Sequence, residues 1–197
     1  HIDVLLTASQ KAFGVCPGLA LVFAGQKSLA RRKSLGDTIP EYFVDYEKWI
    51  PIMDDPSKYF ATPAVNLIWA MKESLQIIMD EGLENRFARH EKQGAAMRAA
   101  LRSLGFEILA EAGHEAPTLS NVLYMDGVDD NKFRSMVQEE GIIVAGGLGA
   151  YAGKMFRIGH MGNADIHDLV CALAAIERTL YRLGVPVKLG SSVGIFM

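Results

Sequence analysis

The chain carries the stretch TASQKAFGVCPG at residues 7–18, between apolar runs that cover residues 2–7 and 19–24. Continuous apolar runs of this length, bounded by turn-forming residues, are typical of buried strands. Lys11 therefore lies in a turn between two expected strands. A lysine amine becomes a nucleophile when burial or nearby positive charge lowers its pKa. Most lysines are surface charges, so position alone leaves a catalytic and a solvated Lys11 both open.

Helical periodicity dominates the middle of the chain. We expect a short helix over residues 28–33 and an irregular, aromatic-rich segment over 34–58 that packs against something, such as another subunit. Apolar residues at helical spacing predict a long helix that opens at Pro63, with Thr62 as its N-cap, and breaks at Gly82. A second helix should then run to about Leu104, with a solvated face marked by four basic side chains: Arg86, Arg89, His90 and Lys92.

The last ninety residues predict a smaller α+β unit. Its expected strands cover residues 106–109, 120–125, 142–145 and 155–160. Its expected helices cover residues 131–140, with Asp129 or Asp130 as N-cap, and 165–183. The glycines of residues 146–149 follow a strand, but no convincing helix follows them, which argues against a nucleotide site and favours a flexible turn.

Arg157 lies inside the apolar strand pattern and needs a partner if it is buried. One interpretation is an internal ion pair with Asp165 or Asp168. The other is a bidentate clamp on a carboxylate, which suits the planar guanidinium. The residue types alone favour the ion pair. We expect His90 and His114 on the surface. His160 lies near Arg157 in the sequence and could border the site, but a packed or solvated histidine is favoured.

Composition excludes several classes of function. The formal net charge of −3 gives no sign of a nucleic-acid or anionic-membrane partner. No apolar run reaches the length that spans a bilayer, no group of residues has metal-ligand spacing, and the two cysteines form no CxxC pair. We expect a cytoplasmic protein without a signal peptide. Because the chain opens directly on a strand pattern without Met, we expect it to be a fragment or a processed piece.

Three segments carry a family resemblance. Residues 7–18 resemble the cofactor-lysine segment of the class V, fold type I aminotransferases that depend on pyridoxal phosphate. In the serine–pyruvate and alanine–glyoxylate group this segment reads T/S-x-SQK-A/C, then PPG; here Cys16 replaces the first proline. Residues 156–163, FRIGHMGN, resemble the family's W/F-RIG-x-MG motif, and Tyr59 and Thr62 match its Y-x-x-T segment. The family also has a Gly-rich segment upstream of its arginine strand.

The resemblance implies a role for each of these residues. Lys11 would be the catalytic Schiff-base lysine and proton shuttle, and Gln10 would help position the cofactor. Arg157 would bind the substrate α-carboxylate. Tyr59 and Thr62 would reach the cofactor phosphate of a neighbouring subunit, which implies a homodimer. The function implied is transfer of an amino group from alanine or serine to glyoxylate or pyruvate.

The resemblance also implies an α/β fold of the aspartate-aminotransferase type, of which this chain would be the C-terminal half. Residues 1–60 would finish the large cofactor-binding domain, 61–104 would form an interdomain helical region, and 105–197 the small domain. The N-terminal half would supply a phosphate-binding loop, an aromatic that stacks on the cofactor ring, and an aspartate for its nitrogen. We expect the chain to be active only with that half.

Two alternatives stay open. The first is another class V chemistry, such as a lyase or a cysteine desulfurase; the desulfurases have a histidine where Gln10 stands here, and Cys16 is better explained as a packing residue. The second is a non-catalytic subunit that retains the fold.

Overall fold

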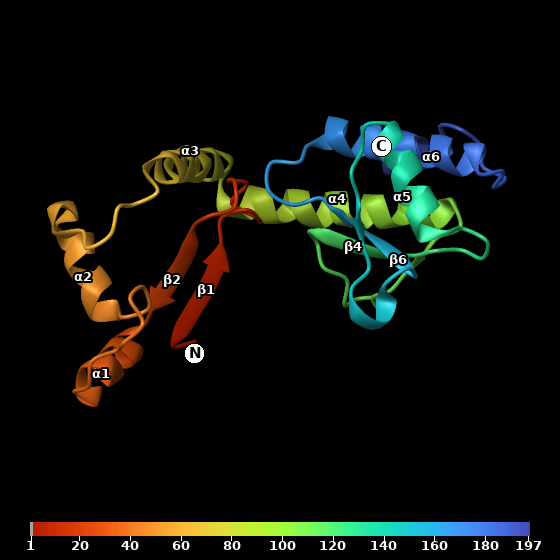
Figure 1. Cartoon of the computed structure of the whole chain (residues 1–197). Coiled ribbons are helices and arrows are strands. Elements are labelled where there is room, and N and C mark those ends of the chain that lie inside the picture. Colours follow the sequence, from red (N-terminus) through yellow and green to blue (C-terminus); the bar gives the residue numbers. More distant parts are fainter. Residues whose placement is uncertain (1) are drawn as a thin grey trace. The chain divides into compact units, whose positions relative to one another are not determined.

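The computed structural model describes residues 2–197, which divide into two compact units (Figure 1). The first unit ends at Ile77, and the second runs from Ile78 to Met197. Among residues 2–197, no helix is both long enough and apolar enough to cross a membrane.

The first unit begins with an antiparallel hairpin of β1 (Val4–Ala8) and β2 (Ala20–Ala24). Both strands were expected, but the expectation that they are buried is wrong for this chain. Leu6 is 73% exposed and Phe23 is 54% exposed. The two strands form a two-stranded sheet by themselves, so no further strand among the described residues covers their edges.

After the hairpin come α1 (Gln26–Leu35), α2 (Tyr46–Asp54) and a 3-10 turn at Pro56–Lys58. The expectation of an irregular segment over residues 34–58 is therefore wrong for its second half. The Asp45 side chain accepts a hydrogen bond from the backbone N–H of Glu47 and so caps α2. It also accepts two hydrogen bonds from Arg32, at 2.8 and 2.9 Å, which lower the pKa of Asp45 to about 2.

The aromatic residues around α2 pack on one another. The Phe60 ring lies edge-on to Tyr42 and Trp49, and the Tyr42 hydroxyl donates to the Phe60 carbonyl. Tyr42 and Phe43 nevertheless stay more than half exposed. This part of the first unit thus has a small cluster of aromatic side chains that stays partly exposed.

The long helical stretch is α3 (Val65–Glu81) followed by α4 (Leu83–Ser103). The break falls at Gly82, as expected, because its φ of 80° lies in the left-handed region that side chains disfavour. The prediction that Thr62 is the N-cap is wrong, since α3 starts at Val65 and its cap position falls on Ala64. Gly105, also at positive φ, follows the end of α4, which lies close to the expected end at Leu104.

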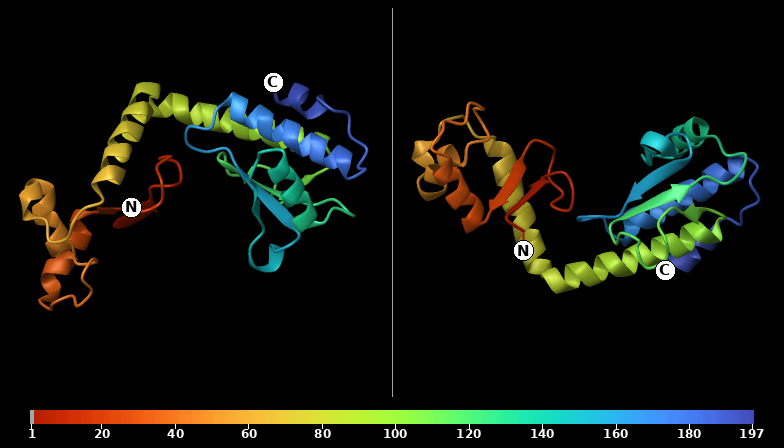
Figure 2. Two further views of the ribbon diagram at one scale, coloured as in Figure 1. Left: turned by 45° about the horizontal axis from the view of Figure 1, so that its top comes forward. Right: turned by 90° about the horizontal axis from the view of Figure 1, so that it is seen from below.

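The second unit is a four-stranded antiparallel sheet with helices packed on it (Figure 2). The strand order is β3-β4-β6-β5, with β3 at Glu107–Ile108, β4 at Leu119–Leu123, β5 at Ala145–Gly146 and β6 at Met155–Gly159. The helices are α4, α5 (Asp130–Glu139), α6 (Ile166–Arg182) and α7 (Ser191–Phe196), with a 3-10 turn at Gly149–Tyr151. Strand β5 was expected at residues 142–145 and lies slightly later.

One apolar core joins this sheet to its helices. Val122 on β4 pairs with Phe156 on β6, so both side chains lie on one face of the sheet. There they meet Leu101 of α4, Phe133 of α5 and several residues of α6, all buried. Because neighbouring residues of a strand point to opposite faces, Arg157 lies on the face away from this core.

Helix α7 was not expected from the sequence. Buried Glu177 of α6 holds its start: the carboxylate accepts hydrogen bonds from the backbone N–H of Gly190 and from both the N–H and the hydroxyl of Ser192. Six residues are too few to show a helical period, which explains why the pattern gave no sign of this helix.

Candidate active site

Lys11 lies in the loop that joins β1 to β2, and a buried serine holds that loop in shape. The Ser9 hydroxyl donates to the Cys16 carbonyl at 2.7 Å and accepts from the N–H of Leu19 at 3.3 Å. Its backbone N–H donates to the Leu19 carbonyl, and its carbonyl accepts from the N–H of Val15. Ser9 is fully buried and therefore ties the two arms of the loop together. Its exposed neighbours Gln10 and Lys11 project from a fixed base.

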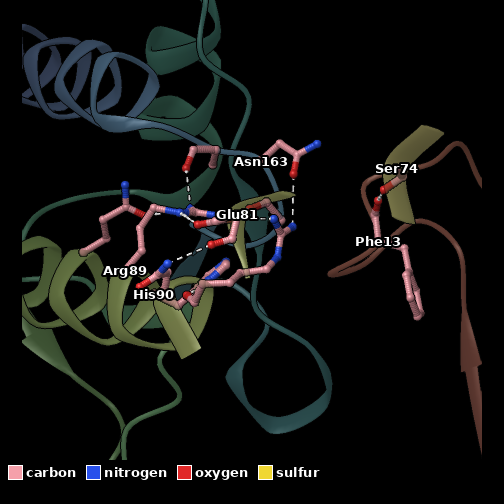
Figure 3. Close-up of polar contacts among 11 residues, drawn as sticks. Phe13, Ser74, Glu81, Arg89, His90 and Asn163 are labelled. Carbon is pink, nitrogen blue, oxygen red and sulfur yellow. Dashed lines mark hydrogen bonds and ion pairs between the residues drawn. The ribbon is translucent and has the colours of Figure 1, made fainter. Parts of the chain in front are cut away.

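Two more contacts fix this loop against α3. The Ser74 hydroxyl donates to the carbonyl of Phe13 (Figure 3). Gly18, at φ 138°, lies so close to α3 that an added Cβ would come within 2.6 Å of Leu67. Within residues 2–197 the Lys11 amine makes no hydrogen bond or ion pair, so it is a free primary amine on a constrained loop.

Tyr59 and Thr62 lie between α2 and α3, and both are exposed. Among the described residues, no hydrogen bond connects either hydroxyl to the Lys11 loop. The chain therefore leaves both hydroxyls open for a partner. It does not bring them onto Lys11 through any direct contact.

Arg157 lies on β6, opposite Ala145 of the edge strand β5 and Asn121 of β4. Its Nε donates to the Gly146 carbonyl at 2.8 Å. Its two terminal nitrogens have no partner within residues 2–197, and its side chain is half-buried. The expected ion pair with Asp165 or Asp168 does not form. Instead, both carboxylates cap α6, where Asp165 accepts from the N–H groups of His167 and Asp168.

The loop after β6 is tied to the start of α4 by an ionic network (Figure 3). Glu81 accepts hydrogen bonds from Arg86 and Arg89, which lower the pKa of Glu81 to about 2, with Arg89 the larger cause. Arg86 also donates to the Asn163 side chain at 3.0 Å. Arg89 donates to the Gly162 and Ala164 carbonyls at 3.0 and 3.2 Å. The expected solvated face of α4 is therefore wrong for Arg86, whose side chain is 6% exposed.

Two histidines of the second unit are buried. His160 is fully buried, and its Nε2 lies 3.0 Å from the hydroxyl of Ser120 on β4. Burial, with a smaller effect of the nearby Arg98, lowers the pKa of His160 to about 4. His90 is also buried, so its expected surface position is wrong; its Nδ1 lies 2.7 Å from the Arg86 carbonyl. Within residues 2–197, His90 Nε2 and His160 Nδ1 have no hydrogen-bond partner.

The features above, a free lysine on a fixed loop and an arginine with two open nitrogens, coincide with a family pattern. The family model described as "Aminotransferase class-V" matches residues 1–163. This chain belongs to the class V aminotransferase family. Among the described residues, no group of three or more His, Cys, Asp or Glu side chains is placed to hold a metal ion.

Relatives of this class V chain include several named aminotransferases. An uncharacterized aminotransferase of Methanocaldococcus jannaschii is 35% identical over 189 residues, which are 95% of this chain and 49% of that protein. Serine–glyoxylate aminotransferase of Arabidopsis thaliana is 32% identical over 98% of this chain and 48% of that protein. The crystal structure of ureidoglycine–glyoxylate aminotransferase from Bacillus subtilis superposes with a TM-score of 0.93 at 25% identity, over 99% of this chain and 51% of that one.

These matches establish the fold of the class V chain as that of the fold type I aminotransferases, as predicted. The chain spans about half the length of the curated relatives it matches. Sequence reasoning missed what holds the site residues. The burial of Ser9, the Gly146 carbonyl and the Arg89 contacts to the 162–164 loop join segments that no local pattern connects.

Proposed function

We propose that this chain carries the cofactor lysine and the carboxylate-binding arginine of an aminotransferase that depends on pyridoxal phosphate. It would move the amino group of a small amino acid, alanine or serine, to glyoxylate or pyruvate. The observation that carries the proposal is the free amine of Lys11 on a loop fixed by Ser9, within the class V sequence pattern. Two relatives are named as glyoxylate aminotransferases, which supports glyoxylate as the acceptor.

The residues present fit the cofactor that the family implies. The cofactor has an aldehyde, and Lys11 offers an exposed primary amine to hold it. Gln10 lies beside Lys11 at the tip of the same loop, where its amide can orient the cofactor. When bound, pyridoxal phosphate supplies the electron sink for reaction at the substrate Cα. The amine of Lys11 would take the proton from the substrate Cα and so act as the general base.

Arg157 binds the substrate carboxylate in this proposal. A guanidinium forms two parallel hydrogen bonds to a carboxylate when two of its nitrogens are open on one edge. The Gly146 carbonyl occupies Nε and leaves both terminal nitrogens for the ligand. Such a bidentate contact fixes the orientation of the substrate, and correct orientation lowers the entropic part of the barrier.

The rest of the site lies outside this chain in the proposal. The half of the relatives that this chain does not match would supply the phosphate loop, the stacking aromatic and the aspartate. Tyr59 and Thr62 would contact the cofactor phosphate of a second copy of the enzyme. Two exposed hydroxyls without partners in residues 2–197 agree with this arrangement.

Peptide mapping tests the cofactor lysine. Borohydride reduction of the complete enzyme loaded with pyridoxal phosphate, followed by digestion, should give a cofactor-tagged peptide modified at Lys11. Lys11→Ala should lose the tag and lower transamination at least ~10²-fold. Lys27→Ala is the matched control, because Lys27 is exposed and forms an ion pair with Asp3; it should keep both. A tag on any other lysine, or none, would refute the assignment.

Product analysis separates the proposal from its alternatives. Alanine with glyoxylate should give pyruvate and glycine. Sulfur release from cysteine, without pyruvate from alanine, would identify desulfurase chemistry instead. A complete protein that takes up no cofactor would be the non-catalytic subunit.

A further inference from the structure

The orientation of Arg157 depends on a hydrogen bond to β5, a short strand at the edge of the sheet. The carbonyl that accepts from its Nε belongs to Gly146, in a strand only two residues long at the edge of the sheet. Two pairs, Ala145 with Arg157 and Gly146 with Phe156, hold that strand. A short edge strand has few hydrogen bonds to resist displacement, so something else must hold Gly146 if Arg157 is to keep a fixed direction.

A second arginine packs against Gly146 from the helix side of the sheet. A Cβ built on Gly146 would lie 3.3 Å from both Cζ and Nε of Arg134 and 3.4 Å from its Nη2. The Arg134 guanidinium therefore lies next to Gly146, in the direction that a side chain at this position would take. Gly146 pairs with core-facing Phe156, whereas Arg157 lies on the opposite face. Gly146 therefore lies between two arginines, with the Arg134 guanidinium on its side-chain face and Nε of Arg157 at its carbonyl.

Arg134 itself is fixed by a bidentate ion pair. Its Nε donates to Asp130 Oδ1 at 2.9 Å, and its Nη2 donates to Oδ2 at 2.7 Å. The Tyr124 hydroxyl donates to the same Oδ1 at 2.9 Å. The Asp130 side chain is 10% exposed. Arg134 lowers the pKa of Asp130, so the carboxylate stays ionised at neutral pH.

Tyr124, which donates to Asp130, is itself held by aromatic residues of the core. The Tyr124 ring packs edge-on against Phe133 and tilted against Phe156, the residue that precedes Arg157. Asp130 occupies Nε and Nη2 of Arg134 and pairs its charge, so Arg134 differs from Arg157, which has no carboxylate partner within residues 2–197. Its role is support.

We propose that Arg134, held by Asp130 and Tyr124, is a positioning residue that supports Gly146 and thereby orients Arg157 toward the substrate carboxylate. The inference rests on the proposed function of Arg157. Without Arg134, Gly146 loses its support, and the two terminal nitrogens of Arg157 lose their direction. A carboxylate then binds more weakly, while the chemistry at Lys11 keeps its groups.

A double-mutant cycle tests this in the complete enzyme. Arg134→Ala, Arg157→Gln and the double variant are compared by the KM for glyoxylate and by calorimetric titration with propionate, an unreactive carboxylate. Arg157→Gln should weaken both by about 100-fold and Arg134→Ala by about 10-fold, the range for loss or misdirection of a hydrogen bond to a charged group. In the Arg157→Gln background, Arg134→Ala should add less than about 2-fold, because the group it orients is gone.

Two variants guard against a trivial loss of folding. Arg134→Lys keeps the charge and the aliphatic stem but loses the fork, so it should raise KM in the same direction with kcat within about 2-fold of wild type. Arg182→Ala removes an arginine that is distant from Gly146 in the sequence. Like Arg134 it forms ion pairs with carboxylates, in this case Glu139 and Glu140. It should leave KM and propionate binding unchanged.

The outcomes are distinguishable. If Arg157→Gln changes neither glyoxylate KM nor propionate binding, the carboxylate site of the proposed function is wrong, and this inference falls with it. If Arg157→Gln weakens both but Arg134→Ala and Arg134→Lys do not, the positioning role alone is overturned. Equal losses from Arg134→Ala in both backgrounds would show a general structural role, and would also overturn it.

Discussion

Protonation of His160 should destabilise the second unit in mild acid. The imidazole is fully buried, its Nε2 faces Ser120, and its ring carbon Cε1 would lie 3.1 Å from a Cβ on Gly94. The charged group that faces it is Arg98, and the titratable one is His90, both on α4. A second positive charge placed there would be desolvated and repelled. The native state therefore keeps His160 neutral.

The size of the effect follows from proton linkage. The pKa of His160 is about 4 in the folded chain, against an ordinary value of 6.5. Between these values the unfolded chain binds a proton that the native state does not, so the free energy of unfolding falls as pH drops from 6.5 to 4. Each pH unit contributes about 1.4 kcal/mol, so the whole window contributes about 3 kcal/mol. Above pH 6.5 the contribution is fully present.

Urea unfolding between pH 4 and 7.5, followed by far-UV circular dichroism, measures this slope. His160→Gln removes the titrating group, so its stability should fall less steeply than that of wild type over this window, whatever its cost at pH 7. His114→Gln removes an exposed imidazole and is the matched control; its profile should run parallel to wild type. Equal slopes for wild type and His160→Gln, or an NMR titration of His160 near pH 6.5, would refute the reasoning.

Three further substitutions have defined outcomes. Gly94→Ala should destabilise by roughly 2 kcal/mol, because its Cβ would lie 2.6 Å from the Pro117 carbonyl; Gly194→Ala, in a helix with no atom within 4 Å, should instead gain up to about 1 kcal/mol. Both are measured by urea unfolding, and equal signs would contradict the packing argument. Glu81→Gln should cost about 2 kcal/mol at pH 7 and nothing near pH 2; since the pKa of Glu81 is lowered to about 2, its contribution is present above pH 4.5 and lost toward pH 2. Gly147→Ala would place a Cβ against the Tyr151 carbonyl and so displace the neighbouring Gly146. The KM for glyoxylate should then rise roughly 10-fold. An unchanged KM would count against the role of the Gly146 carbonyl in orienting Arg157.

The elements with a strong local signal were predictable from the sequence. The two strands around Lys11, the break at Gly82 and the helix capped by Asp129 each follow from a run or a cap that a few neighbouring residues define. Helix α2 was missed because proline, a helix breaker, lies inside it at Pro51. Burial was predicted less well than secondary structure, because His90 and Arg86 look solvent-exposed from the sequence alone. In the fold His90 is buried, and Arg86 donates hydrogen bonds to Glu81 and Asn163.

The candidate site residues could be predicted by motif, but the residues that support them could not, because those supports are contacts between segments distant in sequence. Arg134 lies 12 residues before Gly146 and 23 before Arg157, on a helix whose polar face looks like any solvated face. The structure shows that Gly146, which has no side chain, leaves room for the Arg134 guanidinium. Glycine at position 146 reads in the sequence as flexibility, whereas in the structure it permits close approach.

Arg157 donates to the Gly146 carbonyl and forms no ion pair with Asp165 or Asp168, and this difference matters for its charge. An ion pair with Asp165 or Asp168 would have satisfied the guanidinium, but it would also have neutralised the charge that a substrate carboxylate needs, and the two acids would compete for the same nitrogens. A backbone carbonyl has no charge to cancel. By accepting from Nε alone, the Gly146 carbonyl fixes the plane of the guanidinium and leaves its charge and its two terminal donors intact. The aspartates can then serve α6 as caps. In this second unit Arg86, Arg89 and Arg134 form ion pairs with carboxylates, whereas Arg157, which we propose binds the substrate carboxylate, forms none.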